Sequence, residues 1–250
     1  MITLSLIGIG CGDPEQLTLA AVRAVNAADL ILIPRKGEEK SDLAALRREI
    51  CARVLTNGKT RLVEFDLPVR DAEREDYRGG VDDWHNAVAA AWSREIKTHL
   101  GGDGRAAFLI WGDPSLFDSS LRIAHRLEPS PEIQVIPGVT AIQALCAAHA
   151  IPLNDIGAPF LVTTGRRLRE GGWPAGAETV VVMLDGGAAF QSLDPAGIRI
   201  WWGAFLGMPH QLTFSGPLAE IGATIVDARA KARARHGWIM DSYILKRVTI

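Results

Sequence analysis

The sequence has little cysteine, and what it has is scattered. Its three cysteines, Cys11, Cys51 and Cys146, are far apart and odd in number, with no CxxC pair among them. This argues against a disulfide framework or a zinc ribbon. None of the six histidines is spaced from another as metal ligands are, and the HExxH motif is absent. We therefore expect no bound metal and a reducing, cytoplasmic location.

Long apolar runs and an excess of one charge are also missing. No apolar run approaches the roughly 20 residues of a transmembrane helix. The apolar N-terminus has no basic region of the kind that a signal peptide carries. Lys and Arg number 27 against 29 Asp and Glu, a net charge of −2, whereas nucleic-acid-binding domains are usually strongly basic. We expect no membrane or nucleic-acid partner.

Short apolar runs alternate with amphipathic segments through the first 150 residues, which predicts a parallel α/β sheet. Expected strands cover 3–8, 30–33, 61–65, 106–110 and 133–136. Expected helices cover 18–28, 42–55, 81–100, 119–127 and 139–149. The chain is long enough for two modest domains, since it has 250 residues and is 48% hydrophobic.

The second part of the chain is richer in strands. The segment Ile151 to Pro159 contains two prolines and a glycine and is the best domain boundary. We therefore predict domains 1–150 and 151–250. The strands expected after the boundary cover 160–163, 179–184, 198–205, 212–215 and 238–248. With one long helix over 219–235, this pattern suggests a mixed sheet.

A sharp turn follows the uncharged strand Ala106 to Ile110, which we expect to be buried on both faces. Gly112 permits an unusual backbone angle, and Pro114 blocks further strand pairing. Open α/β sheets bind ligands at this end of their strands. The alternative is an ordinary turn in which Asp113 makes local hydrogen bonds or caps the next helix.

The first glycine cluster, Gly8 to Pro14, differs from known phosphate-binding loops. Its glycines lie at 8, 10 and 12, and the second strand ends in Pro34 and Arg35 instead of a carboxylate. A dinucleotide fingerprint has glycines at i, i+2 and i+5 and that carboxylate, and a P-loop ends in GK[ST]. Because Asp13 would repel a pyrophosphate, the turn suits a neutral or cationic ligand.

The combination of three glycine turns resembles the tetrapyrrole methylases, a family of S-adenosylmethionine-dependent enzymes. The third turn is Pro137-Gly138-Val139-Thr140-Ala141. Because the ends of parallel strands lie on one edge of a sheet, we expect the three turns to converge there. The matching segments, in the family's order and intervals, are 8–20, 28–35, 112–117 and 137–145. The resemblance implies two α/β domains, the first with a mostly parallel sheet and the second with a mixed sheet, and a ligand cleft between them.

The resemblance also implies cofactor contacts for S-adenosylmethionine and its product S-adenosylhomocysteine. The matching positions are Cys11, Gly112, Asp113, Leu116, Thr140, Ala141 and Met183. Cys11 stands where many relatives have proline. Many relatives are homodimers, so we expect a homodimer here as well.

Further segments are most like the members that methylate C1 of precorrin-5 in cobalamin biosynthesis and release the C1 acyl group as acetate. These segments are 66–70, 81–85, 111–123, 163–168 and 238–243. Pro34 stands where relatives that methylate uroporphyrinogen have an aspartate, which argues against that substrate. Two alternatives remain: a precorrin C-methyltransferase without deacetylation, and a nucleotide-binding regulatory module.

A substrate with many carboxylates calls for arginines, because guanidinium groups pair with carboxylates. The candidates are Arg35, Lys36, Arg166, Arg167 and Arg169; the alternative for each is a solvated basic loop. Trp201 and Trp202 could offer a flat apolar wall, although core packing is expected for at least one of them.

Deacetylation also needs an acid–base group. The polar candidates are Asp13, Asp185, His210 and Asp241, and the sequence does not choose among them. Our hypothesis is that Asp13 contributes, because it belongs to the first turn at the sheet edge. Asp113 is a second catalytic candidate, since a carboxylate there could favour a cationic methyl donor.

Overall fold

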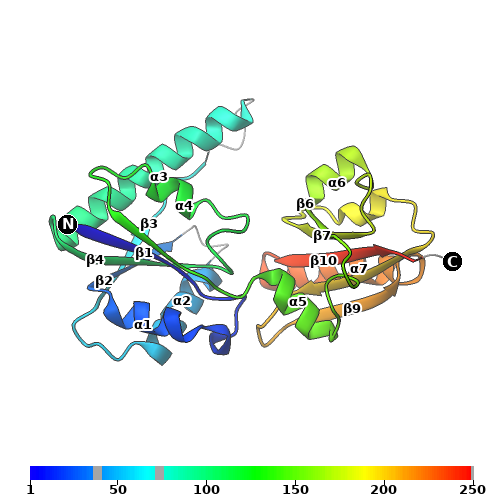
Figure 1. Cartoon of the computed structure of the whole chain (residues 1–250), viewed down its shortest axis with the longest axis horizontal. Helices are drawn as coiled ribbons and strands as arrows, with labels where there is room; N and C mark the ends of the chain where they lie inside the picture. Colours follow the sequence, from blue (N-terminus) through cyan, green and yellow to red (C-terminus); the bar gives the residue numbers. More distant parts are fainter. Residues whose placement is uncertain (36–40, 71–75, 249–250) are drawn as a thin grey trace. The chain divides into compact units, whose positions relative to one another are not determined.

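The computed structural model describes residues 1–35, 41–70 and 76–248. They form two compact units, of which the second begins at Thr140, and each unit is built on its own five-stranded sheet (Figure 1). The predicted fold class, two α/β domains with a parallel first sheet and a mixed second sheet, is confirmed. Among the residues described, no helix has the length and apolarity needed to span a membrane.

The first unit has a fully parallel sheet in the order β3-β2-β4-β1-β5. Its strands are β1 (Ile2–Gly8), β2 (Leu30–Arg35), β3 (Arg61–Asp66), β4 (Gly104–Ile110) and β5 (Glu132–Ile136). Its helices are the short 3-10 helix η1 (Pro14–Gln16), α1 (Leu19–Ala27), α2 (Ser41–Val54), α3 (Tyr77–Leu100) and α4 (Ser120–Ala124). Every strand and α-helix predicted before residue 139 is therefore present.

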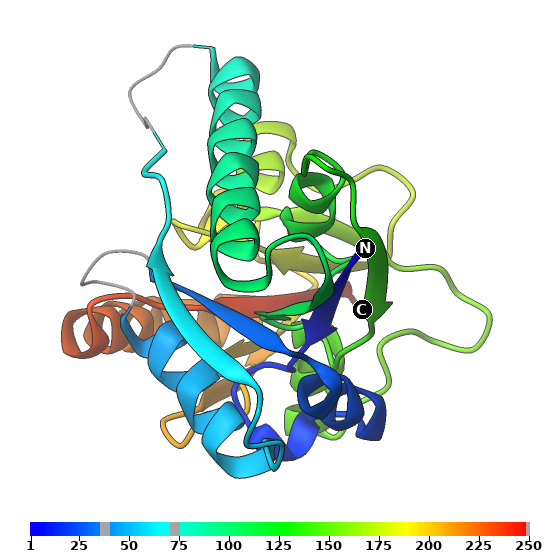
Figure 2. The ribbon, with the colours of Figure 1, turned by 90° about the vertical axis from the view of Figure 1, so that its left-hand side faces the viewer.

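Helices cover both faces of this sheet. Figure 2 shows α3 on one side of the strands and the blue helices α1 and α2 on the other. Because the inner part of β4 carries no charge, both of its faces pack into apolar clusters, and Ala106 to Ile110 are buried as predicted. Backbone hydrogen bonds to β1 run along the whole strand, whereas β2 pairs with it only over Ala106–Phe108.

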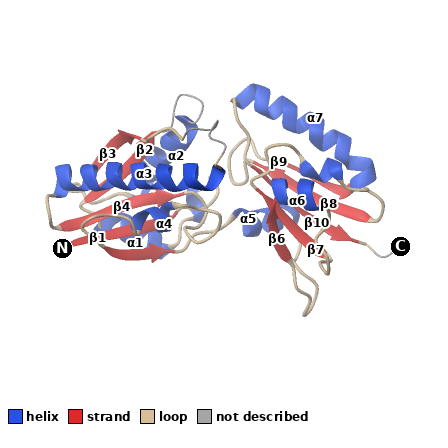
Figure 3. Ribbon diagram, turned by 90° about the horizontal axis from the view of Figure 1, so that it is seen from above, coloured by secondary structure: helices blue, strands red, loops and turns tan. Residues whose placement is uncertain are grey.

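The second unit has a mixed sheet in the order β6-β7-β10-β8-β9, in which β6 and β7 are parallel and the other pairings are antiparallel. The strands are β6 (Leu161–Thr164), β7 (Thr179–Met183), β8 (Ile198–Ala204), β9 (Leu212–Pro217) and β10 (Asp241–Arg247). The helices are α5 (Ala141–His149), α6 (Gly165–Gly171), the 3-10 helix η3 (Ala189–Ser192) and α7 (Leu218–His236). Figure 3 shows α7 running along this sheet.

Helix α5 belongs to the second unit, whereas the predicted boundary at 150 and 151 lies after it. The helix packs on β8: Leu145 lies against the backbone of Gly203, and Nε2 of His149 is 3.0 Å from the carbonyl oxygen of Trp202. The proline-containing segment is a local signal, but packing of α5 on β8 depends on residues more than fifty positions away.

Helix α6 is a feature that the sequence analysis missed. It occupies the stretch after β6 for which no helix was predicted, and where a solvated basic loop was the alternative to substrate-binding arginines. Thr164 caps it, since its hydroxyl accepts a hydrogen bond from the backbone N–H of Arg167 at 3.4 Å. Leu168 is the one side chain of this helix, beyond glycine, that is buried. A seven-residue helix with a single apolar anchor has too little apolar periodicity to be predicted from the sequence.

Candidate functional site

The three glycine turns meet at one edge of the first sheet, as predicted. Gly10 and Gly112 form a short antiparallel bridge, with N–O distances of 3.3 Å and 2.8 Å. A Cβ atom at Gly8 would lie 2.5 Å from the backbone nitrogen of Gly138. Because real Cβ atoms do not approach so closely, only glycine allows the turns after β1, β4 and β5 to touch through their backbones.

Gly112 combines a special backbone angle with open space. Its φ of +66° lies in the left-handed region that favours glycine. A Cβ atom there would meet nothing within 4 Å, so steric crowding is not the reason that glycine is needed at this position. A ligand can approach the backbone at this point, as expected for the carboxyl edge of a parallel sheet.

Asp113 fastens the turn after β4, residues 111–117, which we call the central turn, to the third turn. Its Oδ1 accepts hydrogen bonds from the backbone N–H and the hydroxyl of Ser115, and its Oδ2 accepts one from the backbone N–H of Gly138 at 2.9 Å. Burial opposes ionisation, but the bonds from Ser115 and Gly138 outweigh it and lower the pKa of the Asp113 carboxyl. The carboxylate is therefore ionised at neutral pH and holds two turns together.

We expect the stabilising effect of Asp113 to disappear in acid. Because its pKa is lower in the folded chain than the ordinary value of 3.8, its contribution is complete above that value and is lost as the pH falls through the folded pKa. Asp113→Asn should cost about 1–3 kcal/mol at pH 7, and less below about pH 4. Urea unfolding across pH measures this. Ser115→Ala removes one of the hydrogen bonds that lower this pKa, so the stabilisation by Asp113 should be lost at a higher pH. If Asp113→Asn destabilised the protein equally at every pH, the account would be contradicted.

The first turn is also fixed by its own side chains. Oδ1 of Asp13 accepts a hydrogen bond from the backbone N–H of Glu15 at 2.8 Å and thereby caps η1. Cys11 is buried, and burial raises the pKa of its thiol to about 12. The backbone N–H of Cys11 donates to the side chain of Gln16. Cys11 thus presents a neutral thiol, and the acid–base role of Asp13 stays a prediction.

The other predicted cofactor residues lie at strand and helix ends. Leu116 lies on the central turn and is half-buried. In the second unit, Thr140 caps α5 by accepting a hydrogen bond from the N–H of Ile142 at 3.2 Å, and Ala141 is the first residue of that helix. Met183 is the half-buried last residue of β7. Their cofactor contacts stay predictions.

The predicted substrate arginines have different surroundings. Arg35, at the end of β2, forms an exposed ion pair with Asp66, with Nε 3.0 Å from Oδ1. Arg166 and Arg167 lie in the first turn of α6, not in a loop. Arg169 reaches Oδ1 of Asp185 at 3.3 Å. Lys36 lies outside the described residues.

Two of the acid–base candidates belong to a buried polar network in the second unit. Asp185 accepts hydrogen bonds from the hydroxyl of Tyr243 at 2.7 Å and from backbone N–H groups after β7. Asp241 accepts from Nε1 of Trp202 and from Nε of Arg229, both at 2.9 Å. Burial raises the pKa of Asp241, and Arg229 opposes that rise. Their partners give both carboxylates a structural role.

The remaining candidates pack in the second unit. His210 lies against Phe205, with ring centroids 4.5 Å apart, and stacks on His236 at 4.3 Å. Trp202 is fully buried, which confirms the expected core role for one of the tryptophan pair. In the part of the chain that the structure describes, no three His, Cys, Asp or Glu side chains come together as metal ligands could.

Comparison with known proteins identifies the family. The model of the tetrapyrrole (corrin/porphyrin) methylases matches residues 3–222. The chain is a tetrapyrrole methylase. This tetrapyrrole methylase is 47% identical to a precorrin-6A synthase [deacetylating] of Sinorhizobium sp, over 99% of this chain and 96% of that one. It is 30% identical to a precorrin-2 C(20)-methyltransferase of Sinorhizobium sp, over 72% of each chain.

Solved structures agree with this assignment. A cobalamin synthesis related protein (CobF) from Corynebacterium diphtheriae superposes with a TM-score of 0.85 and 39% identity over 100% of both chains. A uroporphyrin-III C-methyltransferase from Thermus thermophilus, in complex with S-adenosylhomocysteine, matches with a TM-score of 0.60 and 22% identity over 97% of this chain and 96% of that one. The latter likeness concerns the fold alone.

Two charged residues of this tetrapyrrole methylase escaped the sequence analysis. Arg47 of α2 and Asp118 after β4 line a cavity in the first unit. The sequence analysis placed Arg47 in an amphipathic helix and assigned it no function. Asp118 lay just after the central turn and was likewise assigned no function. No sequence motif identifies either residue as functional. Arg47 and Asp118 are far apart in the sequence, and only the folded sheet brings them to the same cavity.

Proposed function

We propose that this tetrapyrrole methylase transfers a methyl group from S-adenosylmethionine to C1 of precorrin-5 and releases the C1 acyl group as acetate, giving precorrin-6A. One observation carries the proposal: the 47% identity to precorrin-6A synthase [deacetylating] extends over 99% of this chain. The precorrin-2 C(20)-methyltransferase is less similar, at 30% identity over 72% of this chain, and therefore carries less weight.

The residues at the edge of the first sheet fit a cationic cofactor. The turns carry a neutral thiol at Cys11, backbone carbonyl oxygens and the ionised carboxylate of Asp113. Open space lies beside the backbone of Gly112. When bound, S-adenosylmethionine supplies an electrophilic methyl group on a positively charged sulfur. Gly112, Leu116, Thr140, Ala141 and Met183 would hold it by the family resemblance.

The chain's own part in methyl transfer is chiefly positioning. Holding donor and acceptor in line can contribute roughly 7–11 kcal/mol through lost freedom of motion. We assign this function to the turns after β1, β4 and β5, because the Asp113 hydrogen bonds and the glycine contacts fix them mutually. Asp113 therefore acts as a positioning residue.

Arg35, Arg166 and Arg167 are our candidates for the substrate carboxylates. Arg35 would have to exchange its exposed ion pair with Asp66 for a substrate carboxylate, which costs little because exposed pairs contribute about 0–1 kcal/mol. Asp13 stays a candidate for the acid–base group of deacetylation. We also propose a cytoplasmic enzyme, supported by three free cysteines, and a homodimer, which size-exclusion chromatography with light scattering tests.

The product mass tests the proposed reaction. The purified protein is incubated with S-adenosylmethionine and enzymatically made precorrin-5. Replacement of the acyl group by methyl should lower the mass of the tetrapyrrole by the elements of carbon monoxide. A gain of CH₂ instead would indicate a precorrin C-methyltransferase without deacetylation. Tighter binding of ATP or NAD than of S-adenosylhomocysteine, with no change in mass, would favour a nucleotide-binding module and overturn the proposal.

A further inference from the structure

A crevice opens in the first sheet between β2 and β4. The two strands pair over Leu30–Leu32 and Ala106–Phe108. Beyond these residues β2 continues beside β3, and β4 continues beside β1. Helix α2, which follows β2 in the chain, packs on one face of the sheet, and α4, which follows β4, packs on the opposite face (Figure 1). Ligands of open parallel sheets bind where successive connections diverge in this way.

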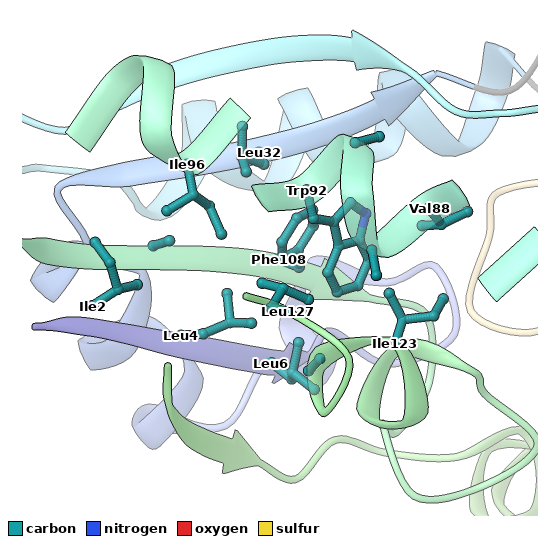
Figure 4. Close-up of a cluster of buried hydrophobic side chains, with 14 of the residues drawn as sticks. Ile2, Leu4, Leu6, Leu32, Val88, Trp92, Ile96, Phe108, Ile123 and Leu127 are labelled. Atoms are coloured by element: carbon teal, nitrogen blue, oxygen red, sulfur yellow. The ribbon is translucent and has the colours of Figure 1, made fainter. Parts of the chain in front are cut away.

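The crevice encloses a cavity of about 240 Å³. Its walls are mainly apolar and include Trp84, Val88, Trp92 and Phe108. Figure 4 shows Val88, Trp92 and Ile123 gathered around Phe108 on the β4 face, where the Trp92 and Phe108 rings stack at 3.8 Å. Pockets for drug-sized ligands measure roughly 300–1,000 Å³, so this one suits a small molecule or one substituent of a large one.

Arg47 brings a positive charge to the wall of the crevice. Its Nε donates to the carbonyl oxygen of Leu109 at 2.8 Å, and its Nη1 donates to that of Leu43 at 3.3 Å. Burial lowers its pKa to about 10, so it is protonated at neutral pH. It forms no ion pair with any carboxylate among the described residues. The guanidinium has five N–H groups, and those not used by the two carbonyls can bind an anion.

Asp118 brings a carboxylate to the same cavity from the β4 side. Its Oδ1 accepts a hydrogen bond from the backbone N–H of Ser120 at 2.6 Å, which fixes the side chain at the start of α4. Its negative charge favours the protonated form of Arg47. A fixed carboxylate and a guanidinium therefore share one small, largely apolar cavity. Hydrolysis of an acyl group requires a base that accepts a proton from the attacking water, as the carboxylate could. It also requires a positive charge that stabilises the developing oxyanion, as the guanidinium could.

We propose that the crevice receives the acyl group that leaves as acetate, with Arg47 binding its oxygen and Asp118 accepting a proton from the attacking water. The inference rests on the proposed function. The water oxygen bonds to the acyl carbon, and the bond from that carbon to C1 breaks. Its electron pair stays with the macrocycle, which takes the methyl group. One proton leaves the water through Asp118 and a second leaves the acetic acid formed, so no oxidant or reductant is needed.

Acetate itself tests the binding half of the proposal. Trp84, Trp92 and Trp111 line the crevice, so their fluorescence should report on potassium acetate added at constant ionic strength, with chloride as the reference. For a ligand of four heavy atoms the Kd should be about 0.1 mM or weaker. Arg47→Met should weaken binding about 10- to 100-fold, and Arg47→Lys should weaken it less. Asp118→Asn should bind acetate at least as tightly, since a nearby negative charge is removed.

A neighbouring arginine provides the matched control. Arg48 lies on the same helix, is half-exposed and pairs with Glu64, with Nη1 2.8 Å from Oε1. Arg48→Met should bind acetate as the unmodified protein does. Equal acetate binding by Arg47→Met and Arg48→Met would overturn the assignment of Arg47.

Single-turnover acetate release tests the chemical half. Asp118→Asn should slow release about 100-fold or more, because a general base is removed, and should keep its affinity for S-adenosylhomocysteine, which also shows that the variant is folded. The proposal requires a larger effect for Asp118→Asn than for Asp13→Asn; the reverse order would overturn it. If the unmodified protein releases no acetate from precorrin-5, the proposed function fails, while the acetate titration still decides whether the crevice binds a small carboxylate.

Discussion

Gly138→Ala should disrupt the edge of the first sheet. A Cβ atom at Gly138 would lie 2.2 Å from the carbonyl oxygen of Gly112 and 2.9 Å from Cα of Gly8. Both are backbone atoms, so neither can rotate away as a flexible side chain would. The third turn must move, and the 2.9 Å hydrogen bond from its N–H to Asp113 is then stretched or broken. We expect a loss of about 3 kcal/mol in stability, at the upper end for overpacking.

The same substitution should weaken cofactor binding, because the proposed site is built on these turns. Affinity for S-adenosylhomocysteine, measured by calorimetry, should fall tenfold or more, which corresponds to about 1.4 kcal/mol. Gly102→Ala is the matched control in the same unit, since a Cβ atom there would meet nothing within 4 Å. Wild-type stability and affinity in Gly138→Ala would show that the turns are not held by backbone contact.

Arg229→Met should destabilise the second unit by about 3–5 kcal/mol, because it leaves a buried carboxylate without its positive partner. The Arg229 and Asp241 side chains are only 11% and 2% exposed, and Nε lies 2.9 Å from Oδ2. Arg229 also donates to the backbone carbonyl oxygen of Asp185 at 2.5 Å. One side chain thus joins α7 to the start of β10 and the segment after β7.

The pH dependence of that loss has a defined sign. Burial already raises the pKa of Asp241, and removing Arg229 removes the hydrogen bond and the charge that oppose the rise. Once Asp241 is protonated, its buried charge disappears, so the deficit of Arg229→Met should shrink as the pH falls.

An exposed lysine on the same helix is the control for Arg229→Met. Lys231 pairs with Asp227 at 2.7 Å, and both side chains are mostly exposed. Lys231→Met should therefore change stability by less than about 1 kcal/mol. Denaturant unfolding measures both variants, and a similar small effect for the two would contradict the role given to the buried pair.

Local sequence was enough to predict the parts of the fold that depend on short-range pattern. The uncharged run of β4, the extent of α1 and the end of α3 at Leu100 all follow from nearby residues. The meeting of the three glycine turns was also predictable, since the ends of parallel strands share one edge.

Contacts between distant residues could not be predicted. Asp185 looked like a polar residue at a strand end, but its partner Tyr243 lies 58 positions away. Arg47 and the carbonyl oxygen of Leu109 are 62 positions apart. Such pairs depend on the order of strands in the sheet, which the amphipathic pattern of a single helix does not encode.

The ratio of acetate to methyl in one turnover tests the central claim most directly. Enzyme in excess over precorrin-5 is mixed with S-adenosylmethionine carrying a labelled methyl group, and both products are followed together. The account predicts one acetate released for each methyl group transferred to the tetrapyrrole. A methylated tetrapyrrole formed without acetate would contradict it.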